Sequence, residues 1–185
     1  MQIKTLAILS LFSILFFAGC DSKEKKESET QAKTEQIIIK NDFLLNTIDG
    51  SVLDIKTDKN SINIKDYENK IIILNFFATW CPACKVEIPA LVRLQNEYKN
   101  DLVVISVLLE EFKNDDDIKN FAKEFGINYK ISHGSETFDL AKAVGGIKSI
   151  PTTFIIEKNG KIYQKIQGLA PYEMLETDIK KVLEK

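Results

Sequence analysis

An almost uninterrupted apolar run at residues 71–77, Ile-Ile-Ile-Leu-Asn-Phe-Phe, restricts the fold of this chain more than any other segment. Apolar side chains stand at both alternating sets of positions, which is typical of a central strand covered on both faces. The run is followed at once by Trp80-Cys81-Pro82-Ala83-Cys84 and then by an amphipathic helical pattern. The chain must therefore fold around a buried strand that delivers two cysteines to the start of a helix.

This position of the cysteines favours thiol chemistry. The first turn of a helix has unpaired N–H groups and about half a positive charge, which favours a thiolate over a thiol. The thiolate is the nucleophile in disulfide exchange. We expect Cys81 to lie at the exposed edge of the turn and to attack, and Cys84, one turn into the helix, to resolve the mixed disulfide.

Two other uses of the pair are less well supported. A structural zinc site needs four ligands, and the chain has only Cys20 and His133 to add to Cys81 and Cys84. A purely structural disulfide would close a very small loop and would gain little chain entropy. The pattern therefore favours redox chemistry with no metal and no cofactor beyond the Cys81–Cys84 disulfide.

The third cysteine follows a secretory pattern. Lys4 precedes an apolar stretch at residues 6–18, which is shorter than the ~20 residues of a membrane span. The sequence Phe17-Ala18-Gly19-Cys20 resembles the bacterial lipoprotein box, which implies that Cys20 becomes the lipidated first residue. An uncut signal anchor with a free Cys20 is the alternative, and both interpretations tether the protein to a membrane outside the cytoplasm.

Composition then divides the chain. Residues 21–36 are dominated by Lys, Glu, Ser, Thr and Gln, and such a segment buries too little apolar surface to fold. We expect a signal peptide at 1–19, a lipidated cysteine and disordered tether at 20–36, and one domain at 37–185. The formal net charge is −2 and no basic stripe is present, so a nucleic acid partner is not expected.

Hydrophobic periodicity and turn signals predict an α/β domain in which one sheet combines parallel and antiparallel strands. Asp49-Gly50 and Asn159-Gly160 are hairpin turn signals. The predicted strands are 43–48, 52–55, a short piece at 62–64, 71–77, 102–109, 128–131, 152–156 and 161–166, and the predicted helices are 82–98, 115–125, 136–144 and 171–183.

The element order, the Trp-Cys-x-x-Cys motif and Ile150-Pro151-Thr152 before a strand together resemble thioredoxin. The resemblance implies a cis proline at Pro151 beside the cysteines. It also implies that Ile150 offers its backbone to an extended substrate segment. We expect Trp80 to shield the disulfide at the rim of the site, and Trp80, Ile150 and Pro151 are the candidate substrate-binding residues. Pro89, inside the predicted helix, matches a proline that kinks this helix in thioredoxins.

Further features resemble the extracytoplasmic TlpA/ResA branch of thioredoxin-like thiol:disulfide oxidoreductases. They are the lipoprotein-like start, the N-terminal hairpin, the inserted helix and strand at about 115–131, and the motif at 75–89, in which Phe77 replaces a usual Trp. The branch implies location on the periplasmic side of the inner membrane. It also implies protein thiol substrates, which include the haem-site thiols of apocytochrome c, and a CcdA- or DsbD-like membrane thiol relay as electron donor.

Asn75 and Glu87 are the other candidate site residues. Cytoplasmic thioredoxins bury an aspartate where this chain has Asn75, which cannot take a proton. Glu87 lies three residues after Cys84, nearly one turn along the same helix face, and can accept the proton of that thiol. The alternative is a solvent-facing glutamate in an ion pair.

The direction of electron flow is less constrained. Ala83 gives no side-chain hydrogen bond to a Cys81 thiolate, which favours a reductant over a disulfide-introducing oxidant. A copper-binding assembly protein that uses both cysteines and His133 is a further alternative. A Cys–His hydrolase has no local signature in the sequence.

Lipidation of Cys20 is the first testable expectation. In cells fed a labelled fatty acid, the label should be found on Cys20, and globomycin should block processing. A Cys20→Ser variant should lose the label. Recovery of an unlipidated protein whose first residue lies beyond Cys20 would contradict the anchor.

Overall fold

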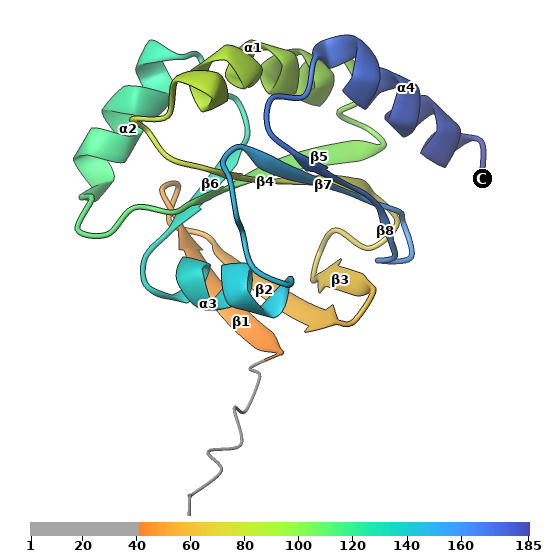
Figure 1. Cartoon of the computed structure of the whole chain (residues 1–185), viewed down its shortest axis with the longest axis horizontal. Coiled ribbons are helices and arrows are strands. Elements are labelled where there is room, and N and C mark those ends of the chain that lie inside the picture. Colours follow the sequence, from red (N-terminus) through yellow and green to blue (C-terminus); the bar gives the residue numbers. More distant parts are fainter. Residues whose placement is uncertain (1–40) are drawn as a thin grey trace, which may run out of the picture. The chain divides into compact units, whose positions relative to one another are not determined.

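The apolar run at 71–77 forms β4 (Ile71–Phe77), a central strand of the sheet in the computed structural model, which describes residues 41–185 (Figure 1). The other strands of this part are β1 (Asp42–Thr47), β2 (Val52–Asp58), β3 (Ser61–Ile64), β5 (Leu102–Leu108), β6 (Lys130–His133), β7 (Thr152–Ile156) and β8 (Ile162–Gln167). The helices are α1 (Pro82–Glu97), α2 (Asp115–Glu124), α3 (Glu136–Ala143) and α4 (Tyr172–Leu183). The expected signal peptide and tether, 1–36, lie outside the described residues.

The strand order is β3-β2-β1-β6-β5-β4-β7-β8. Strands β4, β5 and β6 run parallel, whereas β7 pairs with β4 antiparallel. This is the predicted thioredoxin fold with an N-terminal hairpin and an inserted helix and strand. Because β4, β5 and β6 are parallel, their carboxyl ends meet at one edge of the sheet, where ligands of α/β proteins commonly bind.

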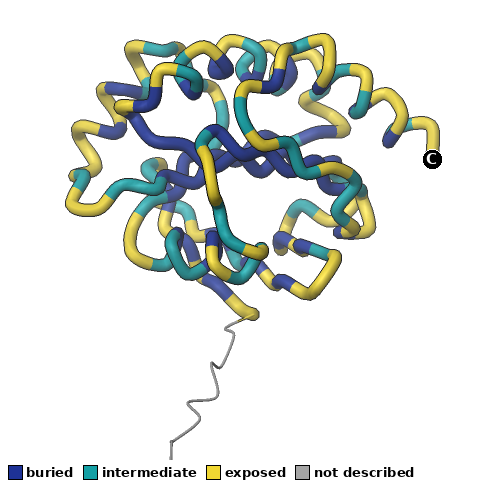
Figure 2. Tube along the Cα trace, viewed as in Figure 1, coloured by how far each residue is buried: buried dark blue, intermediate teal, exposed yellow. Residues whose placement is uncertain are grey.

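Alternating residues of β4 serve two cores. Ile71 and Ile73 belong to a cluster with buried residues of α1 and α4, and Leu74 and Phe76 belong to a cluster with α3 and the N-terminal strands. Figure 1 shows α1, α2 and α4 over one face of the sheet and α3 on the other, and Figure 2 shows the buried central strands between them. The two-sided burial that the sequence predicted is confirmed.

The N-terminal strands also contact the last hairpin. Ser61 and Lys161 form an isolated antiparallel bridge, and the amide of Ile62 donates to the carbonyl of Gly160 at 2.8 Å. Strand β3, at one end of the strand order, is thereby tied to the turn between β7 and β8 at the other end. The cluster that contains Leu74 and Phe76 is enclosed as a result.

Strand β2, predicted to end at 55, runs to Asp58, β6 is displaced by two residues, and the other predicted boundaries agree to within one residue. The strand predicted at 128–131 is β6 at Lys130–His133, since the Asn128 amide instead donates to Val92 and Asn96 of α1. Helix α4 begins at Tyr172, and Pro171 is its N-cap rather than its first helical residue.

In the part of the chain that the structure describes, no helix combines the length and the apolar character that crossing a membrane requires.

The turn at Gly160 generates a stability prediction. Gly160 has φ +82°, and a Cβ there would lie 2.0 Å from Oδ1 of Asn63. Gly160→Ala should lower the free energy of unfolding by about 2–3 kcal/mol, because it combines left-handed strain with a clash. The matched control is Gly50→Ala, at φ +83° with no atom within 4 Å of the added Cβ, which should cost about 1–2 kcal/mol. Urea unfolding measures both, and equal costs would show that the Asn63 contact is unimportant.

Candidate active site

Cys81 and Cys84 form a disulfide at the N-terminus of α1. Cys81 is the N-cap residue, and its sulfur accepts a hydrogen bond from the backbone N–H of Cys84 at 3.1 Å. This amide belongs to the first turn, where no carbonyl is available to accept from it. A hydrogen bond donated to a sulfur favours its charged form, so the same geometry in the reduced protein stabilises a Cys81 thiolate.

The expected exposure of Cys81 is wrong. Cys81 is 4% exposed and Cys84 2%, and both belong to a buried cluster with Phe77, Ile88 and Leu108. Helix position can be read from local sequence, but this burial depends on packing against β4 and β5. In the oxidised form Sγ of Cys81 is therefore shielded from solvent, although it lies close to the rim of the site.

The loop before β7 closes one side of the cysteine pair. The Ile150–Pro151 bond is cis, as the resemblance implied, and the carbonyl oxygen of Ile150 lies 3.7 Å from Sγ of Cys81. A sulfur in a disulfide has no proton to donate, so this contact is packing. The loop is held by Gly168, whose amide donates to the carbonyl of Pro151, and by the Thr152 hydroxyl, which donates to Ser149. The predicted substrate-binding role of Trp80, Ile150 and Pro151 stays a prediction.

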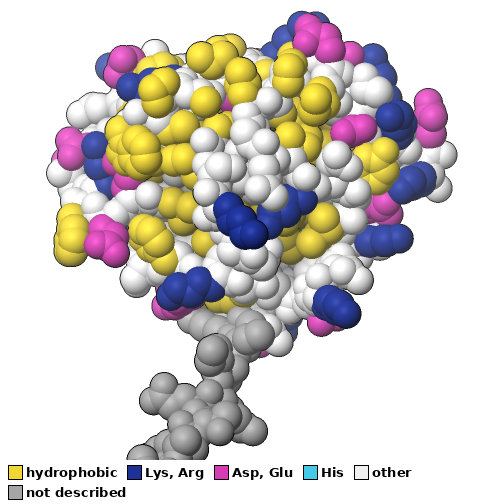
Figure 3. Space-filling model, viewed as in Figure 1, with side chains coloured by type: hydrophobic (Ala, Val, Ile, Leu, Met, Phe, Trp, Pro, Cys, Tyr) yellow, Lys and Arg dark blue, Asp and Glu magenta, His cyan; other side chains and the backbone are white. Residues whose placement is uncertain are grey.

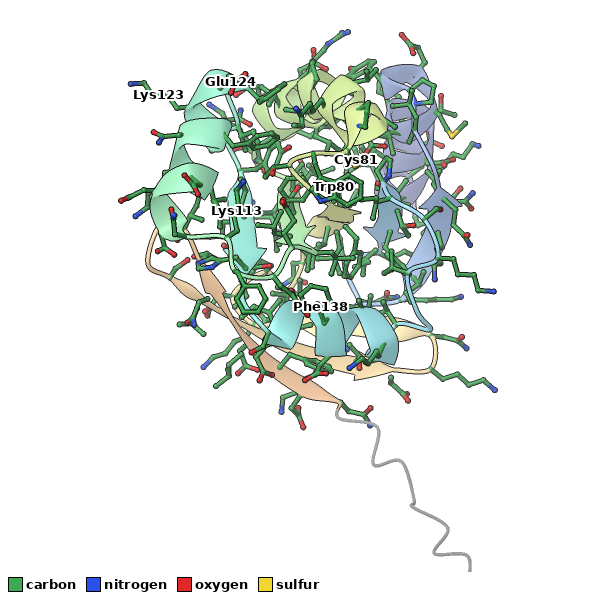
Figure 4. All side chains as sticks on the ribbon, turned by 60° about the vertical axis from the view of Figure 1, so that its left-hand side comes forward. Trp80, Cys81, Lys113, Lys123, Glu124 and Phe138 are labelled. Carbon is green, nitrogen blue, oxygen red and sulfur yellow. A yellow bond between two sulfur atoms is a disulfide. The ribbon has the colours of Figure 1, made fainter. Side chains whose placement is uncertain are left out.

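Trp80 lies at the rim beside Cys81 and is 66% exposed (Figure 4). The preceding residue is fixed by Glu110, which follows β5. The carboxylate of Glu110 accepts from the Thr79 amide at 2.6 Å and from the Thr79 hydroxyl at 3.1 Å. The segment that carries Trp80 is thus attached to the next loop along the carboxyl edge of the sheet.

Glu87 is 1% exposed and faces the sheet, so the alternative of a solvent-facing residue in an ion pair is wrong. Its Oε2 accepts from the Asn75 amide at 2.7 Å and from the Thr153 hydroxyl at 3.5 Å, and its Oε1 accepts from the Ala170 backbone at 2.9 Å. All three donors are neutral. The carboxyl is therefore hydrogen-bonded without a compensating charge.

Burial raises the pKa of Glu87 to about 7, and the hydrogen bonds from Ala170, Asn75 and Thr153 oppose this rise. Desolvation exceeds the three hydrogen bonds because none of the donors carries a full charge. The carboxyl is about half protonated near neutral pH, where a group is best suited to exchange protons. It lies on the buried face of α1 that also carries Cys84.

Sequence reasoning missed the residues that complete this polar chamber. Asn75 pairs with Ser106 of β5 and with Thr153 of β7, and the Ser106 hydroxyl donates to Oδ1 of Asn75 at 3.3 Å. Tyr129 lies near Ser106, and burial, followed by the nearby charge of Glu87, raises the pKa of its phenol. The available signal was the presence of polar residues in otherwise apolar strands, Ser106 in β5 and Thr153 in β7.

His133 lies at the end of β6, where its Nε2 is 3.4 Å from a carboxylate oxygen of Asp115. Across residues 41–185 no group of three or more His, Cys, Asp or Glu side chains is placed to hold a metal ion. The copper alternative thus gains no ligand cluster from this part of the chain. Cys20, the predicted lipidation site, lies outside the described residues.

Comparisons with known proteins agree with this geometry. The model of the AhpC/TSA family matches residues 41–165. The thiol-disulfide oxidoreductase ResA of Bacillus thuringiensis subsp. konkukian is 36% identical over 123 residues, which are 65% of this chain and 68% of that relative. ResA of Oceanobacillus iheyensis is 34% identical over 140 residues, 73% of this chain and 66% of that relative. The crystal structure of a thioredoxin-family thiol:disulfide interchange protein from Chlorobium tepidum matches with a TM-score of 0.60 at 29% identity, covering 77% of this chain and 94% of that one.

The raised pKa of Glu87 predicts a pH-dependent stability. A carboxyl with a pKa of about 7 when folded and 4.5 when unfolded binds its proton more tightly in the native state. The contribution of this carboxyl to the free energy of unfolding is fully present below pH 4.5. It is lost as the pH rises through 7, and the loss is about 3 kcal/mol. Urea unfolding of the oxidised protein from pH 4 to 8 should show this loss, and Glu87→Gln should remove it. Glu124→Gln, at an exposed carboxyl, is the control. A pH-independent difference between Glu87→Gln and the unaltered protein would contradict the assignment.

Proposed function

This chain belongs to the AhpC/TSA family of thioredoxin-like proteins and is a thiol:disulfide oxidoreductase, and we propose that it is a membrane-anchored reductase of disulfides in exported proteins. The observation that carries the exchange chemistry is the hydrogen bond from the Cys84 amide to the sulfur of Cys81 at the start of α1. It favours a thiolate on Cys81, which is the species that begins disulfide exchange. The reductive direction rests instead on Ala83, which adds no side-chain hydrogen bond to that sulfur.

The proposed reaction passes two electrons from the cysteine pair to a substrate disulfide. The Cys81 thiolate attacks one substrate sulfur, the substrate S–S bond breaks, and a mixed disulfide and a substrate thiolate result. The Cys84 thiolate then attacks Sγ of Cys81, which forms the Cys81–Cys84 disulfide and releases the second substrate thiolate. The two protons lost by the cysteines are taken up by the two substrate thiolates.

Glu87 is the proposed proton acceptor for Cys84. Cys84 is buried, so its thiol needs a base that water does not readily supply. Glu87 is one turn along the same face of α1, with a pKa raised to about 7 by burial. The carboxylate takes the thiol proton during resolution and returns it as the product leaves. Replacement by Gln keeps the shape and removes the proton site.

The proposed location is the outer side of the inner membrane, with a lipid on Cys20. The secretory pattern at 1–19 supports this location, and the polar segment at 20–36 supports a tether. The proposed substrates are disulfides of exported proteins, including the haem-site cysteines of apocytochrome c, with a CcdA- or DsbD-like thiol relay as electron donor. The resemblance to the TlpA/ResA branch supports both the substrates and the donor.

Single-cysteine variants test the mechanism. The reduced Cys84→Ala protein should accumulate a mixed disulfide with a disulfide-containing protein, because the attack occurs and the resolving thiol is absent. Cys81→Ala should trap little. Glu87→Gln should accumulate the mixed disulfide transiently, since its resolving step is slowed. Non-reducing electrophoresis and mass spectrometry measure the adduct.

The opposite pattern, with trapping only by Cys81→Ala, would reverse the roles of the cysteines. The direction of the reaction is read in the same experiment. If the oxidised protein oxidises a dithiol peptide fully and the reduced protein leaves the corresponding disulfide intact, the protein is an oxidant and the proposal of a reductase fails.

A further inference from the structure

A pocket of about 530 Å³ lies at the carboxyl edge of β5 and β6, next to the segment that carries the cysteines. One wall is the loop between β5 and α2, and the other is the first half of α3. Figure 4 shows Lys113 and Phe138, one from each wall, in the same view as Trp80 and Cys81. None of the residues that line the pocket takes part in the disulfide exchange.

The pocket is continuous with the active-site rim. Glu110 lines it, and the same carboxylate accepts both hydrogen bonds from Thr79, the residue before Trp80. A polypeptide whose disulfide lies against Cys81 therefore has this pocket directly beside its path. Because parallel strands end at one edge, the pocket and the cysteines both lie at the carboxyl edge of the sheet.

Phe112, on the wall of the pocket, is an outlier in two respects. Its residue surface is 100% exposed, the largest value among the large apolar residues of 41–185, and its φ is +59°. A bulky residue with positive φ is strained, and an exposed ring gains nothing from burial. Neither the strained backbone nor the exposed ring of Phe112 is offset by packing inside the described domain. Strain of this kind gathers at ligand-binding sites.

The surroundings of the pocket are acidic. Three carboxylates and two lysines line the pocket, namely Glu110, Glu111, Asp139, Lys113 and Lys142, and Lys142 is paired with Asp139. The adjoining residues 115–117 add three more carboxylates. Asp115, Asp116 and Asp117 stabilise the first turn of α2, but their charge still extends into solvent. In the space-filling view, hydrophobic and acidic side chains lie next to one another at the edge formed by this loop (Figure 3). An apolar wall within a negative field is complementary to an apolar group next to a cation.

We propose that this pocket is a subsite for the polypeptide substrate, which takes a large apolar side chain from a residue near the substrate disulfide. The chain segment that enters it carries a Lys or Arg beside that apolar residue. Phe112 and Phe138 contact the apolar side chain, and Glu111 faces the basic one. This inference rests on the proposed reduction of protein disulfides and names the class of segment that is reduced fastest.

Four synthetic peptides test the proposal. Each contains one intramolecular disulfide, flanked by Phe-Lys, Ser-Lys, Phe-Glu or Ser-Glu. The reduced protein is mixed with each peptide in single-turnover reactions, and 2-hydroxyethyl disulfide serves as a small substrate that is too short to reach the pocket. The Phe-Lys peptide should react with an about tenfold higher second-order rate constant than the Ser-Lys peptide, because the ring loses water contact in the pocket. Added salt should reduce the preference for Lys over Glu.

Phe112→Asn removes the ring and keeps a residue that tolerates positive φ. It should lower the rate with the Phe-Lys peptide, relative to that with 2-hydroxyethyl disulfide, by about tenfold. Glu111→Gln should lower the preference for Lys over Glu about threefold. The matched control is Leu44→Ser on β1, which removes an exposed apolar side chain away from this edge and should change neither ratio.

Equal rates for all four peptides would overturn the subsite, as would a Phe112→Asn effect of the same size on the Phe and Ser peptides. Failure of the unaltered protein to reduce any peptide or 2-hydroxyethyl disulfide is a different result. It would overturn the proposed function itself, and the two failures are therefore distinguishable.

Discussion

The burial of the Glu87 carboxyl among neutral donors is the interaction on which the active site depends. The carboxyl of α1 is held by Asn75 of β4, by Thr153 of β7 and by the backbone of Ala170, which precedes α4. Four parts of the fold are thereby joined at one atom group. Water would satisfy a carboxylate better than these donors do, so the arrangement persists only because the surrounding apolar clusters exclude water.

The N-terminus of α1, at Cys81, favours negative charge, whereas the first turns of the helix, near Cys84 and Glu87, disfavour it. At Cys81 the backbone N–H of Cys84, which has no carbonyl partner, donates to the sulfur, and the helix terminus favours negative charge. Near Cys84, burial disfavours negative charge, and it is there that the carboxyl holds a proton near neutral pH. Both sulfurs are buried, but Cys81 receives the backbone hydrogen bond and Cys84 lies on the helix face of the carboxyl, so two similar thiols have different tasks.

Sequence reasoning succeeded where the determining interactions are local. The strand at 71–77, the helix that follows the cysteines and the turn at Asn159-Gly160 each depend on patterns within a few residues, and the structure has all three. It failed where segments distant in sequence meet. The burial of Cys81 depends on packing against β4 and β5, and the start of β6 depends on a contact between Asn128 and α1. Ser106 and Thr153 are ordinary strand residues until the register places both beside Asn75.

The segment between α2 and β6, which lies at the surface, affects the environment of the Glu87 carboxyl. The Asn128 side chain donates hydrogen bonds to Val92 and Asn96 of α1, and the next residue, Tyr129, has its phenol near Ser106 and the Glu87 carboxyl. The inserted segment therefore helps to exclude water from the Glu87 carboxyl, although none of its residues bonds to that carboxyl. A chain with the same cysteines but without this segment would admit more solvent near Ser106, and the pKa of its carboxyl would fall toward the ordinary value.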